Sequence, residues 1–219
     1  MMLYQKYRPA TWADFVGQDK AAARVRRIIE RQDFDRGAFW IEAAGANNSG
    51  IGKTSLAWII ARSLADDFFI TELDGGRCDK RAVEDMERAS RTMTWCASKP
   101  FRVWIVNEAH AVTQGAVDAF LTFLEALPRH CVVIFTTTRR VEEGLFGDMD
   151  SGPFASRCHR ITLTNQGLAQ AFAERARMIA QAEGLDGRPV EAYVKLVQTC
   201  KNNMRAVLQR IEAGEMCDE

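Results

Sequence analysis

The sequence lacks long apolar runs and an excess of charge of either sign. No stretch approaches the length of about 18 apolar residues that suggests a membrane span, so we expect no membrane partner. Lysine plus arginine and aspartate plus glutamate number 29 each, which gives a formal net charge of +0. This balance excludes a dominant overall attraction to nucleic acid, but it leaves room for a local basic patch.

Paired cysteines are also missing. The six cysteines are widely scattered, and none forms a Cys-x-x-Cys pair, so we expect no zinc site of that kind. Several lie in apolar surroundings, which is typical of small core residues in a reducing compartment. The first nine residues are polar and basic and have no apolar segment of the kind found in signal peptides. We therefore expect a cytoplasmic protein.

Apolar strand patterns alternate with helical patterns over the first three quarters of the chain. The strand patterns are continuous rather than alternating, which indicates a parallel sheet covered by helices on both faces. From about residue 165 only helical patterns follow, so we expect an α/β domain over 1–164 and a small three-helix domain over 165–219. Strands are predicted near 39–43, 68–73, 101–106, 131–135 and 159–163, helices near 20–31, 79–90, 114–127, 166–183, 189–199 and from 204, and an extended lead-in over 1–19.

A Gly-Lys-Thr sequence stands between the first strand pattern and a helical pattern. In this context it matches the phosphate-binding P-loop, although Asn47 replaces the first glycine of the pattern. Backbone N–H groups of such a loop bind phosphates, Lys53 reaches the terminal phosphates, and the Thr54 hydroxyl holds Mg²⁺. The predicted phosphate-binding residues are Asn48, Ser49, Gly50, Ile51, Gly52, Lys53, Thr54 and Ser55.

The third predicted strand ends in Asn107-Glu108, where P-loop proteins usually carry two acids. Glu108 keeps the role of orienting the attacking water. Asn107 can accept a hydrogen bond from a metal-bound water but adds no negative charge, so metal affinity should fall. The fourth strand ends in Thr136, Thr137 and Thr138, where a hydroxyl could contact the γ-phosphate, although such a cluster is more often a simple turn.

Further short motifs accompany these in a fixed order. Tyr7-Arg8-Pro9 and Val16-Gly17-Gln18 precede the P-loop, and Ser156-Arg157-Cys158 and Asn203-Met204-Arg205 follow the threonines. Together the motifs resemble the AAA+ clamp-loader ATPases, which include the bacterial polymerase III gamma/tau subunit and the small subunits of replication factor C. The resemblance implies a five-stranded parallel sheet of order 5-1-4-3-2 and a helical lid.

The resemblance also implies a role for each matched residue, with ATP and Mg²⁺ as cofactors. Thr137, or its neighbour Thr136, would sense the γ-phosphate, and Arg205 would tie the lid to the nucleotide. Arg157 would be an arginine finger that reaches a neighbouring subunit's site. The partners would be other AAA+ subunits, DNA, and a sliding clamp or another DNA-bound protein. The candidate residues for contact with DNA are Lys80, Arg81, Arg88 and Arg91. The adenine pocket would be formed by Tyr7, Arg8, Pro9, Val16 and Gly17.

The sequence departs from the family pattern in several places. Asn47 and Asn107 are two of these departures. The sequence also has no cysteine-rich zinc module between 65 and 101, and we expect no collar domain after the lid. The segment 139–153 is longer than usual, and its glycine and acidic residues predict a mobile loop.

Three functions stay open at this level. The chain could be an ATPase acting on DNA or a DNA-bound partner in replication or repair, and slow as an isolated subunit. It could be a weakly active or inactive nucleotide-binding scaffold, or an AAA+ protein of a phage or mobile element with another client. Retention of all the reactive residues favours the first function: Lys53, Thr54, Glu108, Arg157 and Arg205.

Overall fold

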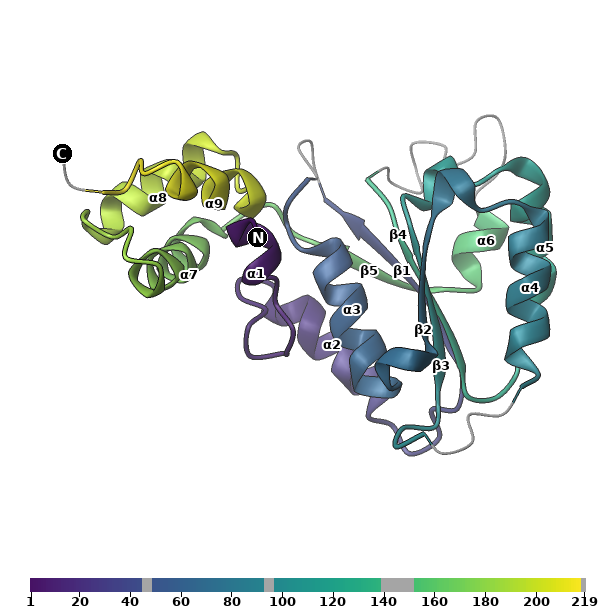
Figure 1. The fold of residues 1–219 in the computed structure, drawn as a ribbon. Helices are drawn as coiled ribbons and strands as arrows, with labels where there is room; N and C mark the ends of the chain where they lie inside the picture. Colours follow the sequence, from purple (N-terminus) through teal and green to yellow (C-terminus); the bar gives the residue numbers. More distant parts are fainter. Residues whose placement is uncertain (45–48, 93–96, 139–151, 218–219) are drawn as a thin grey trace.

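The computed structural model describes residues 1–44, 49–92, 97–138 and 152–217. Within these residues, five parallel strands form one sheet of order β2-β3-β4-β1-β5, the order that the family resemblance implies (Figure 1). The loop predicted over 139–153 falls largely outside the described residues, as do Asn47 and Asn48. The strands are β1 (Gly37–Ala43), β2 (Ile70–Asp74), β3 (Arg102–Asn107), β4 (Cys131–Thr136) and β5 (His159–Leu163).

Helices cover both faces of the sheet, as its continuous apolar strands predict. Successive residues of a strand point to opposite faces, so Phe39 and Ile41 of β1 join one apolar cluster, whereas Ala38 and Trp40 join the other. The first face packs against α2 (Asp19–Ile29) and α3 (Lys53–Leu64). The second packs against α4 (Lys80–Ser90), α5 (Gln114–Glu125) and α6 (Gly152–Ser156).

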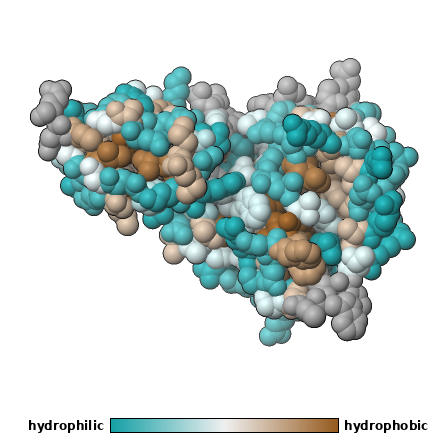
Figure 2. All heavy atoms as spheres, viewed as in Figure 1, coloured by the Kyte–Doolittle hydropathy of each residue, from teal (hydrophilic) through white to brown (hydrophobic). Residues whose placement is uncertain are grey.

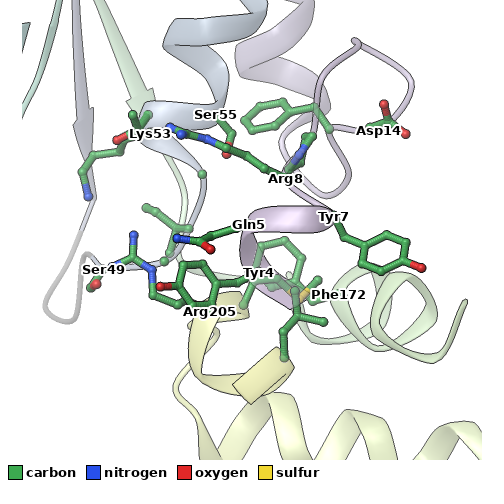
Figure 3. Close-up of a pocket in the computed structure, with 18 of the residues that line it drawn as sticks. Tyr4, Gln5, Tyr7, Arg8, Asp14, Ser49, Lys53, Ser55, Phe172 and Arg205 are labelled. Atoms are coloured by element: carbon green, nitrogen blue, oxygen red, sulfur yellow. The ribbon is translucent and has the colours of Figure 1, made fainter. Parts of the chain in front are cut away.

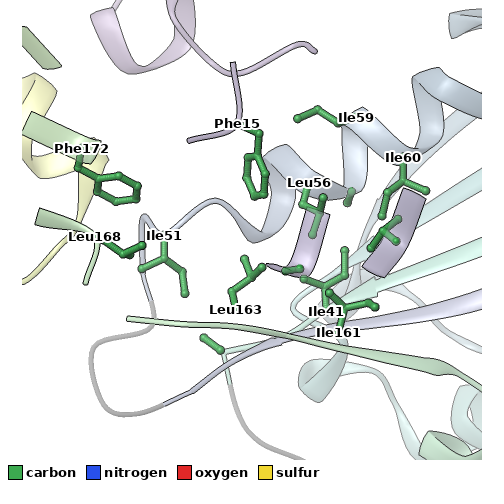
Figure 4. Close-up of a cluster of buried hydrophobic side chains, with 14 of the residues drawn as sticks. Phe15, Ile41, Ile51, Leu56, Ile59, Ile60, Ile161, Leu163, Leu168 and Phe172 are labelled. Carbon is green, nitrogen blue, oxygen red and sulfur yellow. The ribbon is translucent and has the colours of Figure 1, made fainter. Parts of the chain in front are cut away.

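Three further helices follow β5: α7 (Ala169–Ala182), α8 (Val190–Thr199) and α9 (Met204–Glu212). They form a group beside the sheet (Figure 1). A group of this small size buries little apolar surface by itself. Their apolar side chains instead continue the cluster on the first sheet face. Leu168 and Phe172 approach Ile51 of the phosphate loop, as Figure 4 shows.

The N-terminal segment differs from the expected extended lead-in. Leu3–Lys6 forms a short helix, α1, which packs against α9. Leu3 is buried in the cluster that also holds Val207 and Leu208, so this apolar anchor orders a segment whose own sequence has no helical pattern. A four-residue helix leaves no room for periodicity, and tertiary contact decides its conformation.

Smaller differences concern element ends. The second strand begins at Ile70 rather than Phe68, because Asp67–Phe69 forms a 3₁₀ turn that leaves Phe68 exposed. The helix expected near 20–31 is α2, which begins at Asp19 and ends at Ile29, and the side chain of Gln18 before it bonds to the backbone of Thr164. Polar residues cover most of the face seen in Figure 2, and no helix in the described ranges is long and apolar enough to cross a membrane.

We predict that Gly75→Ala lowers the free energy of unfolding by about 1–3 kcal/mol, the usual cost of overpacking. A Cβ atom at Gly75 would lie 2.4 Å from the carbonyl oxygen of Glu108 and 2.8 Å from that of Asn107. Chemical denaturation measures the effect. Gly115→Ala is the matched control, because nothing lies within 4 Å of its Cβ position on α5, and it should be neutral or stabilising. Equal effects of the two substitutions would contradict the close approach.

Candidate nucleotide-binding site

A cavity of about 510 Å³ lies where the phosphate loop, the N-terminal segment and α9 meet (Figure 3). Most of the residues predicted from the sequence line it. Those from the phosphate loop are joined by Glu108 at the end of β3 and Arg205 on α9, which are far apart in the sequence. The predicted residues that line the cavity are Tyr7, Arg8, Pro9, Val16, Ser49, Gly50, Ile51, Gly52, Lys53, Thr54, Ser55, Glu108 and Arg205.

The phosphate loop needs its two glycines. Gly50 and Gly52 have φ angles of +71° and +103°, which other residues rarely adopt. A Cβ atom at Gly50 would also lie 1.9 Å from Oδ1 of Asn203, and the carbonyl of Gly50 accepts the Met204 N–H at 3.2 Å. Gly52 is followed directly by α3, so the N–H groups of the first helical turn face the end of the loop.

Lys53 is the first residue of α3, and its side chain lies in the cavity wall. It is 7% exposed, and this burial lowers the pKa of its ammonium group, while the nearby Glu108 carboxylate works in the opposite direction. A phosphate in the cavity would favour the charged lysine in the same way as Glu108 does. The glycine cradle, the helix N-terminus and this buried cation therefore suit a phosphorylated ligand.

Glu108 stands in an unusual backbone conformation for a residue with a side chain, with φ of 50°. Its Oε2 accepts a hydrogen bond from the Thr138 hydroxyl at 3.0 Å and lies 3.4 Å from Nδ1 of His110. Left-handed residues of this kind are often found at functional sites, where surrounding contacts hold them. The result is a carboxylate fixed at the cavity wall.

Two residues predicted at strand ends lie outside the cavity wall. Asn107, expected beside the metal, does not line the cavity, because its Oδ1 accepts from the Thr136 hydroxyl at 2.9 Å and its Nδ2 donates to Glu72 at 2.6 Å. Among the three threonines, Thr138 lines the cavity. Thr137 is fully buried, with its hydroxyl 3.2 Å from the His110 ring. Thr138 and Glu72 line the cavity at these strand ends, whereas the roles of Thr137 and Asn107 stay predictions.

The side of the cavity away from Lys53 is aromatic and apolar. Phe172, Ile179 and Leu208 come from the helices after β5. Arg205 lies between the two sides of the cavity: its guanidinium is 5.4 Å from the centroid of the Tyr4 ring, and its charge helps to lower the pKa of Lys53. Figure 3 shows Tyr4 and Arg205 beside each other between α1 and α9. Such a wall can accept the flat face of a base.

The N-terminal motif contributes partly as predicted. Tyr7 borders the cavity, but its hydroxyl donates to Glu183 at the end of α7, where Lys6 also binds at 2.6 Å. Burial lowers the pKa of the Arg8 guanidinium, and the Glu72 carboxylate partly offsets this. Gly17 lies outside the lining and instead leaves room for Leu168, which would be 3.0 Å from a Cβ atom there.

Several lining residues were not predicted. Glu72 and Thr138 follow strands, and the rule that ligands bind at the carboxyl ends of parallel strands could have identified them. Tyr4, Gln5, Asp14, Phe15 and Arg175 carry no motif in the sequence and reach the cavity through tertiary packing.

Arg157 lies away from the cavity. Its guanidinium binds the Glu125 carboxylate at the end of α5 and the backbone carbonyl of Pro153, and its side chain is 30% exposed. The residue is not part of the cavity wall of its own chain.

Comparisons with known proteins identify the family of this chain. The model of the ATPase family associated with various cellular activities (AAA) matches residues 46–161, more than half of the chain. The chain is 31% identical over 166 residues to the DNA polymerase III subunit gamma/tau of Mycobacterium tuberculosis. This aligned region covers 63% of this chain and 27% of that protein. It is 26% identical over 217 residues to the replication factor C small subunit of Methanoregula boonei, which covers 96% of this chain and 62% of that protein.

The chain thus spans less than two thirds of the length of these relatives. Among solved structures, the RuvB Holliday junction branch migration motor of Thermotoga maritima is similar over 94% of this chain and 64% of its own, with a TM-score of 0.69. At 16% identity this likeness concerns the fold. By the match over residues 46–161, the chain belongs to the AAA family of ATPases.

Proposed function

We propose that the chain is a clamp-loader-like ATPase module that binds ATP with Mg²⁺ between the sheet edge and α7–α9. The observation that carries the proposal is one cavity lined by the phosphate loop, Glu108 and Arg205. Its cationic side suits the phosphates, and its aromatic side suits the base. In this proposal residues 1–164 form the nucleotide-binding domain and 165–219 form a lid.

Each side chain has a role that follows from its place. Lys53 and the loop N–H groups bind the phosphates, and Arg205 joins them from α9, so nucleotide binding would fix the lid. Glu108 would orient the attacking water and accept its proton, with Thr138 holding the carboxylate. Mg²⁺ bound with the nucleotide would be held partly by the Thr54 hydroxyl and would neutralise charge on the phosphates.

The proposal assigns Arg157 to a neighbouring subunit's site. Arg157 lies outside the cavity of its own chain, and its family motif suggests a place at a neighbour's cavity, where it would add to the chain's own Arg205. Arginine fingers raise turnover by about 10³–10⁵ in other ATPases and GTPases. Assembly with other AAA+ subunits would then switch on hydrolysis, and an isolated chain would be slow.

DNA or a DNA-bound protein is the proposed client, since the relatives are named as DNA polymerase III and replication factor C subunits. The basic residues predicted to contact DNA lie on α4 or directly after it, but acids on this helix pair with three of them. Arg91 binds Glu87 at 2.6 Å, Arg88 binds Asp85 at 3.1 Å, and Lys80 lies 3.8 Å from Glu84. We therefore propose a modest, salt-sensitive contact formed in an assembled ring.

Lys53→Ala should reduce ATP affinity roughly 10- to 100-fold, because charge-assisted hydrogen bonds contribute about 1.5–3 kcal/mol each. Isothermal titration calorimetry with ATP and Mg²⁺ measures the loss. Lys80→Ala on exposed α4 removes the same charge outside the cavity and should bind like the wild type. Wild-type protein that binds no ATP at millimolar concentration would refute the proposed function and favour a scaffold without nucleotide.

Mixing two inactive variants tests the arrangement in trans. Arg157→Ala keeps a complete cavity but donates no finger, and Glu108→Gln donates a finger but cannot activate water. Each alone should lose most ATPase activity, by about 10³-fold or more for Arg157→Ala. Their mixture should regain a substantial part, because each supplies what the other lacks.

The control for this experiment is Arg129→Ala, an exposed arginine 3.1 Å from Asp35, which lies at the amino ends of the strands and outside the cavity wall. It should keep wild-type turnover. A mixture as inactive as its components, or an Arg157→Ala variant with full activity, would contradict an arginine finger in trans.

A further inference from the structure

Glu72 is an acid at the cavity wall that lies outside the motifs described above. It lies near the end of β2, the strand beside β3, in which Ile105 is its neighbour in the register and Asn107 lies two residues further on. Parallel strands present their carboxyl ends at one edge of the sheet, so the longer glutamate side chain can reach the level of residue 107. Glu72 lines the cavity together with Lys53, Thr54 and Glu108.

The hydrogen bonds of Asn107 engage both ends of its side-chain amide. Its oxygen accepts from Thr136 at 2.9 Å, and its amide nitrogen donates to Oε1 of Glu72 at 2.6 Å. The amide therefore points a donor, not an acceptor, toward Glu72. A metal ion and its water shell require acceptor oxygens, and a carboxylate that accepts one N–H bond keeps further lone pairs for them.

We propose that Glu72 supplies the carboxylate for the divalent cation bound with the nucleotide, in place of the acid missing at position 107. Asn107 is then a positioning residue, which holds Glu72 through its amide. The charge lost at 107 is restored from the next strand, with acidic charge kept beside Thr54 and Glu108. The inference rests on the proposed ATP site and specifies how that site handles Mg²⁺.

A rival role for Glu72 is to balance Arg8. The Glu72 carboxylate acts on the Arg8 guanidinium, and both residues line the cavity. The two roles predict different effects of Mg²⁺ on nucleotide binding when the charge of Glu72 is removed. If Glu72 only balances Arg8, its charge should affect nucleotide binding equally with and without Mg²⁺. If it serves the metal, the effect should appear only in the Mg²⁺ dependence.

The test measures binding of a fluorescent ATP analogue by anisotropy across a titration from EDTA to excess Mg²⁺. Glu72→Gln keeps the shape of the side chain and an oxygen for Asn107 but removes the charge. Its Mg²⁺ midpoint should rise roughly 10- to 100-fold, the usual effect of losing a residue that supports a metal site. Its affinity in EDTA should equal that of the wild type, which also shows that the variant folds.

Two further variants complete the design. Glu84→Gln removes the same charge from exposed α4 and should keep the wild-type midpoint. Glu72→Gln combined with Asn107→Asp moves the charge to position 107 and should bring the midpoint back toward the wild type. A combined variant with a midpoint as high as that of Glu72→Gln would show that negative charge at these strand ends does not set the Mg²⁺ dependence, and it would overturn the proposal.

The outcomes separate this inference from the proposed function. A wild type that binds no nucleotide at any Mg²⁺ concentration overturns both. A wild type whose binding depends on Mg²⁺, together with a Glu72→Gln variant of unchanged midpoint, overturns the role of Glu72 alone. A variant weakened equally in EDTA and in Mg²⁺ assigns Glu72 to Arg8 and also overturns the metal role.

Discussion

The direct contact between the phosphate loop and α9 is the constraint on which the rest of the site depends. The Met204 N–H donates to the carbonyl of Gly50, and Asn203 packs so closely that a side chain at Gly50 has no room. Asn203 also caps α9 by accepting the Ala206 N–H at 3.2 Å. A shift of α9 therefore changes the loop, and an ordered loop fixes α9.

The N-terminal segment makes a second link between the same parts. Leu3 and Tyr4 of α1 lie against α9, Lys6 and Tyr7 bind Glu183 at the end of α7, and Asp14 lies 3.3 Å from Arg175. In the proposed function these contacts border the base end of the cavity. A nucleotide between the sheet edge and the helices would then add to an interface that is already formed. The position of the lid would depend on which arrangement of the two parts gives the nucleotide more contacts.

Much of the fold and the phosphate end of the site could be predicted from the sequence. Continuous apolar strands indicate a parallel sheet, and a glycine loop before a helix indicates phosphate binding, because both depend on local pattern. The short helix α1 could not be predicted in this way, since Leu3 is ordered by distant residues of α9. Which of the threonines at the end of β4 lines the cavity depends on the side to which each residue points. Three threonines in a row do not show this, so the sequence did not single out Thr138.

The same distinction between local pattern and tertiary contact applies to the predicted roles of individual residues. Those set by the loop itself, such as Lys53, lie in the cavity wall. Asn107 was assigned by its place in a motif, but the neighbouring strand decides where its amide points. The role of Arg157 stays a prediction, because it concerns a second subunit, and no property of one chain decides it.

The most direct measurement of the central claim is hydrogen–deuterium exchange with and without ATP and Mg²⁺. The account predicts slower exchange in three segments together: residues 3–8 of the N-terminal segment, 49–56 of the phosphate loop, and 204–209 of α9. Joint protection is expected because a nucleotide in this cavity contacts all three. Protection confined to the loop, or unchanged exchange in every segment, would contradict a nucleotide bound between the sheet edge and the helical group.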